Sequence, residues 1–366
     1  MDALRTSLAA VALGEKRTEL REFPLPSIGT DAGLLRVEAS GICGSDVGKY
    51  RDSVGPRILG HECVGIIEEI GEAAAYRWGV RAGDRVALEE YLPCGHCEFC
   101  RAGEIRSCLE TDNRLPGAIR YGSTSINVSP ALWGGYSQFL YMHPRSVIHR
   151  VPANVPTHIA AMALPIGNGF QWVYLDAGAA PGKTVVIQGP GQQGLGCVIA
   201  AKIAGADQII VSGLAHDEKR FAVAKALGAH HCVAVDQEEL GAAVSRITGG
   251  RMADIVVDVS GLGYENLNPS MQLLRKRGVL VTVAMSKPPQ LLDADRLVRM
   301  QIVLRGTRGH SYEAVEMALR TMAAGTLPLE LMATHRAGLA DVDHALRMVG
   351  GEFAERSIHV SVTPWA

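Results

Sequence analysis

The sequence lacks several features that would place it in a special class of protein. Aromatic residues make up only 5% of the 366 residues, and no uninterrupted apolar run approaches the roughly 18 residues that a transmembrane helix needs. Lys and Arg number 36 against 38 for Asp and Glu, so the formal charge of −2 offers no basic footprint for nucleic acid or for an anionic membrane. We find no internal repeat and no low-complexity segment, which excludes a repeat architecture. Hydrophobic residues at 47% and charged residues at 20% instead indicate an ordinary globular chain of about two domains.

The N-terminal apolar stretch 8–13 has only a faint likeness to an export signal. It is short, and Glu15, Lys16 and Arg17 follow it at once, so we expect a first β-strand there. Without an export signal, clustered cysteines are expected to be thiolates in a reducing compartment rather than disulfides. We therefore expect a cytoplasmic protein.

Two hydrophobic patterns divide the chain. In the first half, short apolar runs are bounded by Gly and Pro, which predicts an irregular β-barrel. In the second, β-branched runs alternate with helical runs, which predicts βαβ units and a doubly wound parallel sheet. The predicted fold class is therefore α/β, with a β-rich domain of 1–164 and 301–366 and a dinucleotide-binding type of domain over 165–300. Expected strands lie at 34–39, 63–70, 84–88, 184–188, 209–212, 231–235, 255–259, 279–284 and 357–363, and expected helices at 195–203, 221–227 and 313–322.

A cysteine cluster marks a candidate metal loop over residues 94–108. Its members form the pattern C-x2-C-x2-C-x7-C: Cys94, Cys97, Cys100 and Cys108. Four thiolates fill the tetrahedron that Zn²⁺ prefers and leave no open position, so the pattern predicts a structural zinc. An iron–sulfur cluster uses the same ligands, but the run lacks the Cys-Pro ending of the bacterial ferredoxin pattern. We expect His96, inside the loop, to be solvated rather than a ligand.

A glycine-rich run marks a candidate cofactor site. The segment 189–194, GPGQQG, matches G-x-G-x-x-G between a predicted strand and a predicted helix, which is the context that the dinucleotide fingerprint requires. Gly189 would make the tight turn, Gly191 would let the backbone approach the pyrophosphate, and Gly194 would let the helix pack on the strand. Leu195 would follow in the first turn of that helix, whose N-terminus would face the phosphates. The cofactor is therefore expected to be NAD or NADP.

The end of the next predicted strand does not separate these two cofactors. An acid usually stands there and binds the ribose hydroxyls. Gly213 occupies that position here, while Asp217 and Glu218 follow among basic side chains. Nothing at the strand end repels a 2′-phosphate, so both cofactors remain open. An aspartate in place of Gly213 is expected to favour NAD.

Two further motifs complete a recognisable order. They are GICGSD at 41–46 and GHE at 60–62. Together with the cysteine loop, GGY at 134–136 and the glycine-rich run, their order over nearly the whole chain resembles the zinc-dependent medium-chain dehydrogenases, which include alcohol, sorbitol and threonine dehydrogenases. The resemblance implies a GroES-like catalytic domain, a Rossmann domain and an active site in the cleft between them.

The resemblance also implies roles for individual residues. Cys43 and His61 match the first two catalytic zinc ligands of the family. Asp46 matches the carboxylate that steadies the zinc histidine, and Ser45 matches the hydroxyl that bonds the substrate oxygen and passes its proton outward. Taken singly, these residues have purely structural interpretations: Cys43 as a buried thiol, His61 as a core histidine and Ser45 as a turn residue. Their joint occurrence favours the site.

Three positions qualify the resemblance. Leu164 stands where sorbitol and threonine dehydrogenases often carry a glutamate at or near the metal, and leucine cannot bind a metal. Glu62, directly after the zinc histidine, is therefore the expected third ligand; the alternative is that it only supports another ligand. Gly48 stands where several relatives carry a relay histidine, so Ser45 would release protons through water or the cofactor ribose. Asn168 lies where the family contacts the nicotinamide.

These features predict an alcohol dehydrogenase with two Zn²⁺ per chain that transfers a hydride between a secondary alcohol or polyol and NAD(P). A zinc-poor enone or quinone reductase of the same fold is one alternative, and a non-catalytic binding protein is another. Metal content distinguishes the zinc-poor reductase from the predicted alcohol dehydrogenase, and cofactor binding distinguishes the non-catalytic protein from it. The expected partners are a small alcohol or carbonyl compound and further copies of the chain, as a homodimer or homotetramer, with no nucleic acid and no membrane.

Overall fold

The computed structural model describes residues 5–52, 55–111, 115, 117–261, 263–283 and 291–366. The chain folds into two compact units. The first unit comprises the residues up to 164 with 319–324 and 333–366, and the second comprises 165–318 with 325–332. Within the described ranges, no helix is long and apolar enough to cross a membrane.

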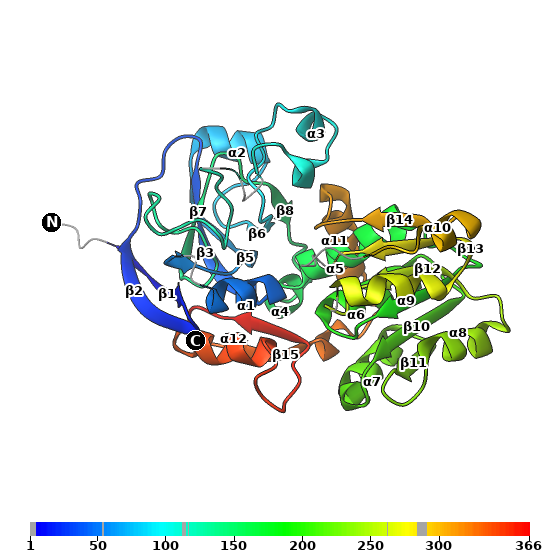
Figure 1. Cartoon of the computed structure of the whole chain (residues 1–366). Helices are drawn as coiled ribbons and strands as arrows, with labels where there is room; N and C mark the ends of the chain where they lie inside the picture. The colour runs from blue at the N-terminus through cyan, green and yellow to red at the C-terminus, as the bar shows by residue number, and fades with distance from the viewer. Residues whose placement is uncertain (1–4, 53–54, 112–114, 116, 262, 284–290) are drawn as a thin grey trace. The chain divides into compact units, whose positions relative to one another are not determined.

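The first unit is built mainly from β-strands (Figure 1). Its strands are β1 (Thr6–Gly14), β2 (Arg17–Pro24), β3 (Gly33–Gly41), β4 (Arg57–Ile58), β5 (Glu62–Ile70), β6 (Arg85–Leu88), β7 (Phe139–Met142), β8 (Ile148–Arg150), β15 (Ala333–Ala337) and β16 (His359–Val362). Its helices are α1 (Gly44–Arg51), α2 (Glu72–Trp78), α3 (Glu98–Arg101), η1 (Ile105–Ser107), α4 (Thr157–Ala160), η6 (Leu339–Asp341) and α12 (Val342–Val349). The N-terminal stretch is thus a strand, as its sequence predicts.

Two sheets form the framework of the first unit. A three-stranded sheet has the order β2-β1-β4, and a seven-stranded sheet has the order β15-β16-β3-β5-β6-β8, with β7 also paired to β3. One hydrophobic cluster packs β1 against α12 through residues such as Val11 and Leu346. A second cluster fills the space around β3, β5 and β6 with residues such as Val37, Ile67 and Val86.

The second unit is a doubly wound sheet. Its strands are β9 (Thr184–Gln188), β10 (Gln208–Gly213), β11 (His231–Ala234), β12 (Ala253–Asp258), β13 (Leu274–Thr282) and β14 (Val303–Gly306). Its helices are η2 (Phe170–Asp176), α6 (Gln192–Ile203), η3 (Ala215–Asp217), α7 (Glu218–Leu227), α8 (Leu240–Thr248), η4 (Gly263–Asn266), α9 (Leu267–Gln272), α10 (Ala294–Arg299) and η5 (Leu329–Leu331). Two more helices span the division between the units: α5 (Ala163–Gly169) and α11 (Tyr312–Ala324).

The strand order of the second unit shows where a ligand of this kind of sheet would bind. All six strands are parallel, in the order β11-β10-β9-β12-β13-β14, so the winding reverses at β9. Every residue of β9 is buried, because connecting helices pack around the sheet (Figure 1). Ligands of such sheets bind beside the carboxyl ends of the strands at the reversal point. The α/β fold class expected from the sequence is confirmed.

The sequence predicts that the second domain ends at residue 300, but the compact second unit extends to residue 318. The strand β14 lies beyond that residue, yet it pairs in parallel with β13, with Val303 opposite Val279. The second unit therefore continues through most of α11. The chain then returns to the first unit, where β16 pairs antiparallel with β3.

Asp254 in β12 fastens the amino ends of three central strands. Its carboxylate accepts the Thr184 N–H of β9 at 2.9 Å and pairs with Arg275 of β13 at 2.6 Å. Burial alone would raise the pKa of Asp254, but the Thr184 N–H and Arg275 outweigh it and hold this pKa below its usual value. The ionised carboxylate therefore contributes stability that is present above the unfolded pKa, roughly 3.9, and is lost as the pH falls through the lower folded value.

We predict that Asp254→Asn lowers the free energy of unfolding at pH 7 by about 1–3 kcal/mol, because Arg275 and the Thr184 N–H lose a charged acceptor. The difference from the wild type should shrink as the pH falls below about 4, because the carboxylate of the unfolded chain is protonated there first and the native carboxylate follows only at its lower pKa. Urea denaturation at both pH values measures it. Asp295→Asn, which removes an exposed partner of Arg299, is the control; equal midpoints for the two variants at pH 7 would contradict the prediction.

Candidate functional site

The three predicted catalytic zinc ligands are gathered by one pair of strands. The strand β3 ends at Gly41, and Cys43 is the N-cap of the helix α1 that follows. The strand β5 pairs antiparallel with β3 and places Glu62 opposite Gly41, so His61 arrives beside the start of α1. Backbone hydrogen bonding thus brings together two motifs that are about twenty residues apart in the sequence.

The geometry of this cluster fits a zinc ion. One ligand atom from each of Cys43, His61 and Glu62 lies within 4.8 Å of the others. Tetrahedral zinc with ordinary bond lengths needs its ligand atoms roughly 3.3–3.8 Å apart, so a small contraction lets all three bind one ion. Thiolate, imidazole and carboxylate are donors that zinc accepts, and a fourth position stays open for a substrate oxygen. Leu164 is buried and offers no donor atom.

Asp46 holds the imidazole of His61 in place. It is fully buried, and its Oδ1 lies 3.2 Å from His61 Nδ1. Its Oδ2 accepts the Tyr136 hydroxyl and the Cys43 N–H, each at 3.1 Å. Burial opposes ionisation, but the charges of His61 and Lys49 and the hydrogen bonds with His61 and the Cys43 N–H lower the pKa of Asp46. Because Nδ1 is engaged, Nε2 is the ring nitrogen directed to a metal.

The electrostatics of the cluster favour a bound cation. Burial, reinforced by the nearby charges of Asp46 and Glu90, raises the pKa of Glu62 to about 7, although His61 opposes the shift. Burial also works against a charged His61, but Asp46 and Glu90 raise the pKa of this imidazole well above its usual value. Arg120 offsets the charge of Glu90, but Asp46 and Glu62 still concentrate negative charge beside one buried imidazole. A divalent cation would neutralise that charge.

Ser45 and Gly48 both belong to α1. Ser45 is exposed in the first turn, two residues after Cys43. Its hydroxyl is therefore accessible beside the cluster. Gly48 follows one turn later and provides no side chain, as its identity predicts.

The sequence did not reveal the part played by Glu90. The ladder between β5 and β6 ends where Cys63 pairs with Leu88, and the backbone bends at Glu90. Only the folded structure therefore brings the charge of Glu90 to act on His61. Neither Glu90 nor its neighbours form a motif by themselves.

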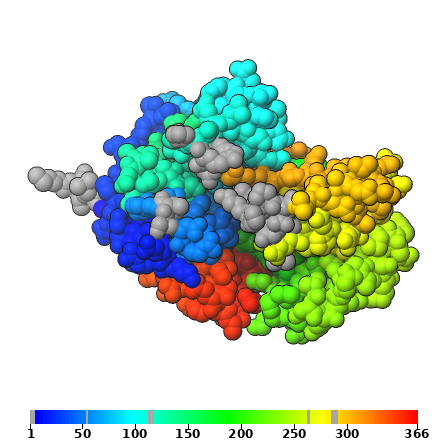
Figure 2. All heavy atoms as spheres, in the orientation of Figure 1, coloured from blue at the N-terminus to red at the C-terminus, as the bar shows by residue number. Residues whose placement is uncertain are grey.

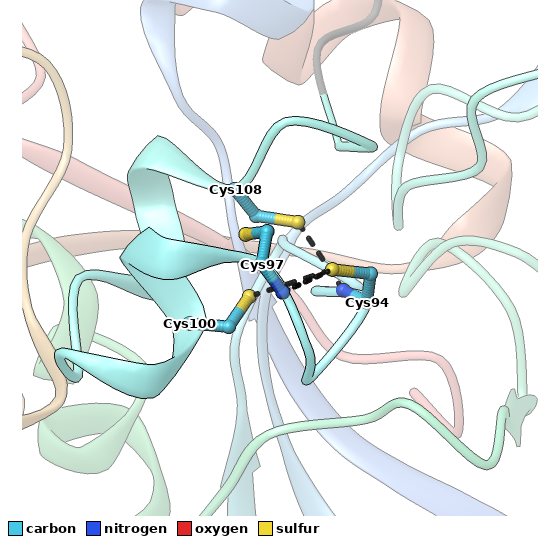
Figure 3. Close-up of side chains that lie close together, drawn as sticks. All are labelled: Cys94, Cys97, Cys100 and Cys108. Atoms are coloured by element: carbon cyan, nitrogen blue, oxygen red, sulfur yellow. Dashed lines mark hydrogen bonds between the residues drawn. The ribbon is translucent and has the colours of Figure 1, made fainter.

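The cysteine loop forms a second, separate donor set. Figure 3 shows the four sulfur atoms facing one another, and all lie within 4.8 Å, with those of Cys94 and Cys100 3.9 Å apart. The Cys97 N–H donates to Cys94 Sγ at 3.3 Å, and the Cys94 N–H donates to Cys108 Sγ at 3.2 Å. Backbone N–H groups of Leu109 and Cys100 lower the pKa of Cys97 to about 6, which favours a thiolate. Four thiolates in this arrangement fit a closed zinc site.

The loop lies on the surface of the first unit, coloured cyan in Figure 2. His96 is exposed and pairs with Glu110 at 3.1 Å. Across the described ranges, which include all eight cysteines, no disulfide forms. The four thiols of the loop are therefore all available to hold a metal ion.

The glycine-rich turn joins β9 to α6. Gly189 has a φ of +107°, a value that favours glycine. A Cβ on Gly194 would lie 1.8 Å from the Gly189 carbonyl oxygen, so glycine is required for close packing there. A Cβ on Gly191, the N-cap of α6, would meet nothing within 4 Å. The backbone at Gly191 thus faces open space, as a pyrophosphate site requires.

A cavity of about 820 Å³ lies beside this turn. Gly189, Gly191 and Gly213 line it. Leu195 is fully buried in α6, so its side chain packs in the core rather than lining the cavity. The cavity fits the adenosine and pyrophosphate portions of a dinucleotide in its position beside the strand ends.

Gly213 cannot simply be replaced by an acid. A Cβ there would lie 2.8 Å from Pro190 Cγ and 3.0 Å from the Phe221 ring, so an aspartate would displace its neighbours. The expectation that an aspartate here favours NAD stays a prediction, and the substitution carries this steric cost. Asp217 and Arg220 also line the cavity, and they pair with each other at 2.9 Å. Asp217 and Arg220 therefore offset each other, while Glu239 is a second acid in the cavity wall.

Asn168 braces the start of α6. Its Nδ2 donates to Gln193 Oε1 at 3.1 Å, and its Oδ1 lies 2.8 Å from His310 Nδ1. These bonds connect α5, the first turn of α6 and the segment after β14. The structure thus assigns Asn168 a supporting contact to the turn that the cofactor approaches.

Comparisons with known proteins agree with this geometry. Residues 29–153 match the alcohol dehydrogenase GroES-like domain family, and residues 194–324 match the zinc-binding dehydrogenase family. The chain is 34% identical over 351 residues, 94% of each protein, to a probable alcohol dehydrogenase of Mycobacterium tuberculosis. It is 28% identical, over 97% of each protein, to the erythritol/L-threitol dehydrogenase of Mycolicibacterium smegmatis.

Solved structures share the same fold. An alcohol dehydrogenase of Thermotoga maritima superposes with a TM-score of 0.85 at 24% identity. A putative zinc-binding dehydrogenase of Sinorhizobium meliloti, bound to NADP, gives 0.84 at 23% identity. Each comparison covers 98% of this chain and 100% of the other.

The first unit is thus a GroES-like domain and the second a Rossmann domain, which defines an oxidoreductase of the alcohol and polyol dehydrogenase type. The chain belongs to the zinc-dependent medium-chain dehydrogenase family. The family expected from the motifs is confirmed.

We predict that Cys97→Ser removes one equivalent of zinc and lowers the free energy of unfolding by about 2 kcal/mol or more, because a closed thiolate site contributes directly to folding. Zinc analysis and thermal denaturation measure the two effects. Cys232→Ser, at a cysteine outside the candidate metal groups of the described residues, is the control. Full zinc content and unchanged melting in Cys97→Ser would remove this loop from the metal sites.

We predict that substitutions at two glycines of the cofactor turn change different properties, cofactor affinity at one and stability at the other. Gly191→Val should weaken NADH or NADPH binding about tenfold or more without lowering the melting temperature, since its side chain enters open space that the pyrophosphate needs. Gly194→Ala should lower the unfolding free energy by about 1–3 kcal/mol, because its Cβ meets a backbone carbonyl. Fluorescence titration and thermal denaturation distinguish the two. Unchanged affinity in Gly191→Val would exclude this turn from the cofactor site.

Proposed function

We propose that the protein is a zinc-dependent alcohol dehydrogenase that transfers a hydride between a secondary alcohol or polyol and NAD or NADP. The catalytic zinc is held by Cys43, His61 and Glu62, and a structural zinc by the cysteine loop. The substrate is a small alcohol or carbonyl compound, and the active enzyme is a homodimer or homotetramer.

The convergence of Cys43, His61 and Glu62 supports this proposal most strongly. Three donors of the kinds that zinc prefers lie within 4.8 Å, and Asp46 supports the histidine from behind. A reductase without a catalytic metal has no need of such a set. The open cavity at the glycine-rich turn supplies the matching cofactor site.

Each residue of the cluster in the first unit has a separate role in the reaction. When bound, Zn²⁺ polarises the alcohol oxygen as a Lewis acid, and the nicotinamide accepts the hydride. Cys43 and Glu62 supply two negative charges that balance the ion, and Asp46 keeps the His61 ring oriented. The exposed hydroxyl of Ser45 takes up the alcohol proton and passes it to water or to the cofactor ribose, since Gly48 offers no side chain to extend a relay.

Metal content measured together with activity tests the proposal. The purified protein should hold two zinc ions per chain and oxidise members of a panel of secondary alcohols and polyols with NAD or NADP. Mild chelation should remove one equivalent first, together with activity, because a site with one thiolate binds zinc less tightly than one with four. Added Zn²⁺ should restore both.

The variant Glu62→Gln assigns the labile zinc. It should weaken retention of the zinc that chelation removes first and should lower kcat. The melting temperature of the protein should stay close to that of the wild type, because the zinc of the Cys94–Cys108 loop is still bound. Full activity with a single zinc per chain would favour a zinc-poor reductase instead. Absence of any shift in melting temperature with NAD, NADH, NADP or NADPH would favour a non-catalytic binding protein.

A further inference from the structure

The four-cysteine loop needs a route by which a metal ion can reach it. A zinc ion with four thiolate ligands has no free coordination position, so it enters and leaves by exchanging one ligand at a time. Cys108 is only 4% exposed, whereas Cys94, Cys97 and Cys100 are partly exposed. An ion from solution therefore meets the partly exposed cysteines before it meets Cys108.

A second group of metal-binding side chains shares one cysteine with this loop. It consists of Cys94, His96 and Glu110, and one ligand atom from each of them lies within 4.8 Å of the others. His96 Nε2 is 3.1 Å from Glu110 Oε1, and the two side chains are 69% and 49% exposed. Sulfur, nitrogen and oxygen donors that zinc accepts are thus close enough at the surface to share one ion.

Hydrogen bonds connect His96 and Glu110 to the two ends of the loop. His96 Nδ1 lies 3.1 Å from the Cys94 carbonyl oxygen, which only accepts, so this ring nitrogen carries the hydrogen. Nε2 is then the nitrogen that can bind a metal, and a backbone carbonyl behind the other ring nitrogen is usual for metal-binding histidines. The Glu110 N–H donates to Cys108 Sγ at 3.4 Å. Both side chains are therefore kept beside the cysteine loop.

Arg145 limits how firmly this second group can hold a cation. Its Nη1 lies 3.3 Å from Glu110 Oε2, which leaves Oε1 for His96 and for an ion. The charge of the guanidinium repels a divalent cation beside it. The group also offers one sulfur atom, whereas the loop offers four, and zinc favours the site richer in thiolate. An ion captured at His96 and Glu110 is therefore expected to move on into the loop.

We propose that His96 and Glu110, together with Cys94, form an entry site through which Zn²⁺ passes into and out of the four-cysteine loop. An incoming hydrated ion exchanges water for His96, Glu110 and the sulfur of Cys94. The other three cysteines then replace His96, Glu110 and the remaining water, and each thiol that binds releases its proton to water. Cys94 stays bound throughout the transfer. This inference rests on the proposed function, because it assumes that the loop holds a structural zinc.

Replacement of zinc by Cd²⁺ in the holoprotein tests the entry site. Cd²⁺ binds thiolates tightly, and cadmium–sulfur bonds absorb ultraviolet light, so the growth of this absorption follows mainly the site with four thiolates. His96→Asn and Glu110→Gln should each slow the replacement about tenfold, at the low end of what a lost supporting contact costs in metal binding. The double variant should lie within about twofold of either single variant, because both side chains act in the same step.

Two equilibrium measurements and a matched control accompany the rates. Zinc content and melting temperature should stay at the wild-type values in both variants, because neither His96 nor Glu110 belongs to the filled four-thiolate site. The control is Glu355→Gln: Glu355 Oε1 also pairs with a histidine, His335, with 3.3 Å between the oxygen and Nε2. No candidate metal group among the described residues contains this pair, so its loss should leave the replacement rate unchanged.

Distinct outcomes separate failure of the inference from failure of the proposed function. A wild type without cadmium–thiolate absorption would overturn the structural zinc of the proposed function. Wild-type replacement rates in both His96→Asn and Glu110→Gln would show an ordinary ion pair and overturn the inference alone. Slower replacement together with lost zinc or a lower melting temperature would show permanent support of the loop and overturn it too. An additional zinc that survives dialysis and disappears in both variants would replace the entry site by a permanent one.

Discussion

The antiparallel pairing of β3 with β5 is the constraint on which the first unit depends. It sets Gly41 opposite Glu62 and so brings the start of α1 beside the turn before β5. One further strand, β6, pairs with β5, and the segment after it carries Glu90, whose charge acts on His61. A slip of one residue in either pairing would turn these side chains to the other face of the sheet and disperse the donors.

Buried charge gives this cluster its chemical character. Asp46 is ionised through its bonds to His61, Tyr136 and the Cys43 N–H, and it leaves one imidazole nitrogen for a metal. The carboxylates of Glu62 and Glu90 add negative charge that water cannot screen well in the interior. The unit therefore offers one donor set that suits a divalent cation, and the cysteine loop offers a second, separate donor set.

The cofactor half of the protein rests on backbone geometry rather than on charge. The winding of the sheet reverses at β9, and the turn after this strand needs glycine for a positive φ at Gly189 and for the close approach at Gly194. Asn168 and Gln193 then hold the first turn of α6 beside the cavity. Asp217 and Arg220 in the cavity wall are already paired with each other, and Glu239 is a further acid in that wall.

The sequence by itself determined the α/β class, the family, the cysteine loop and the cofactor turn, because each depends on residues that are close together in the chain. Local spacing dictates where four thiolates or three glycines can point. Only the tertiary structure decided that the second domain extends through β14, that Leu195 is a core residue and that an acid at Gly213 would meet Pro190. Glu90 and Arg120 belong to that second group as well. Arg120 pairs with Glu90, whose charge acts on His61, and these three residues are far apart in sequence, so no local pattern reveals them.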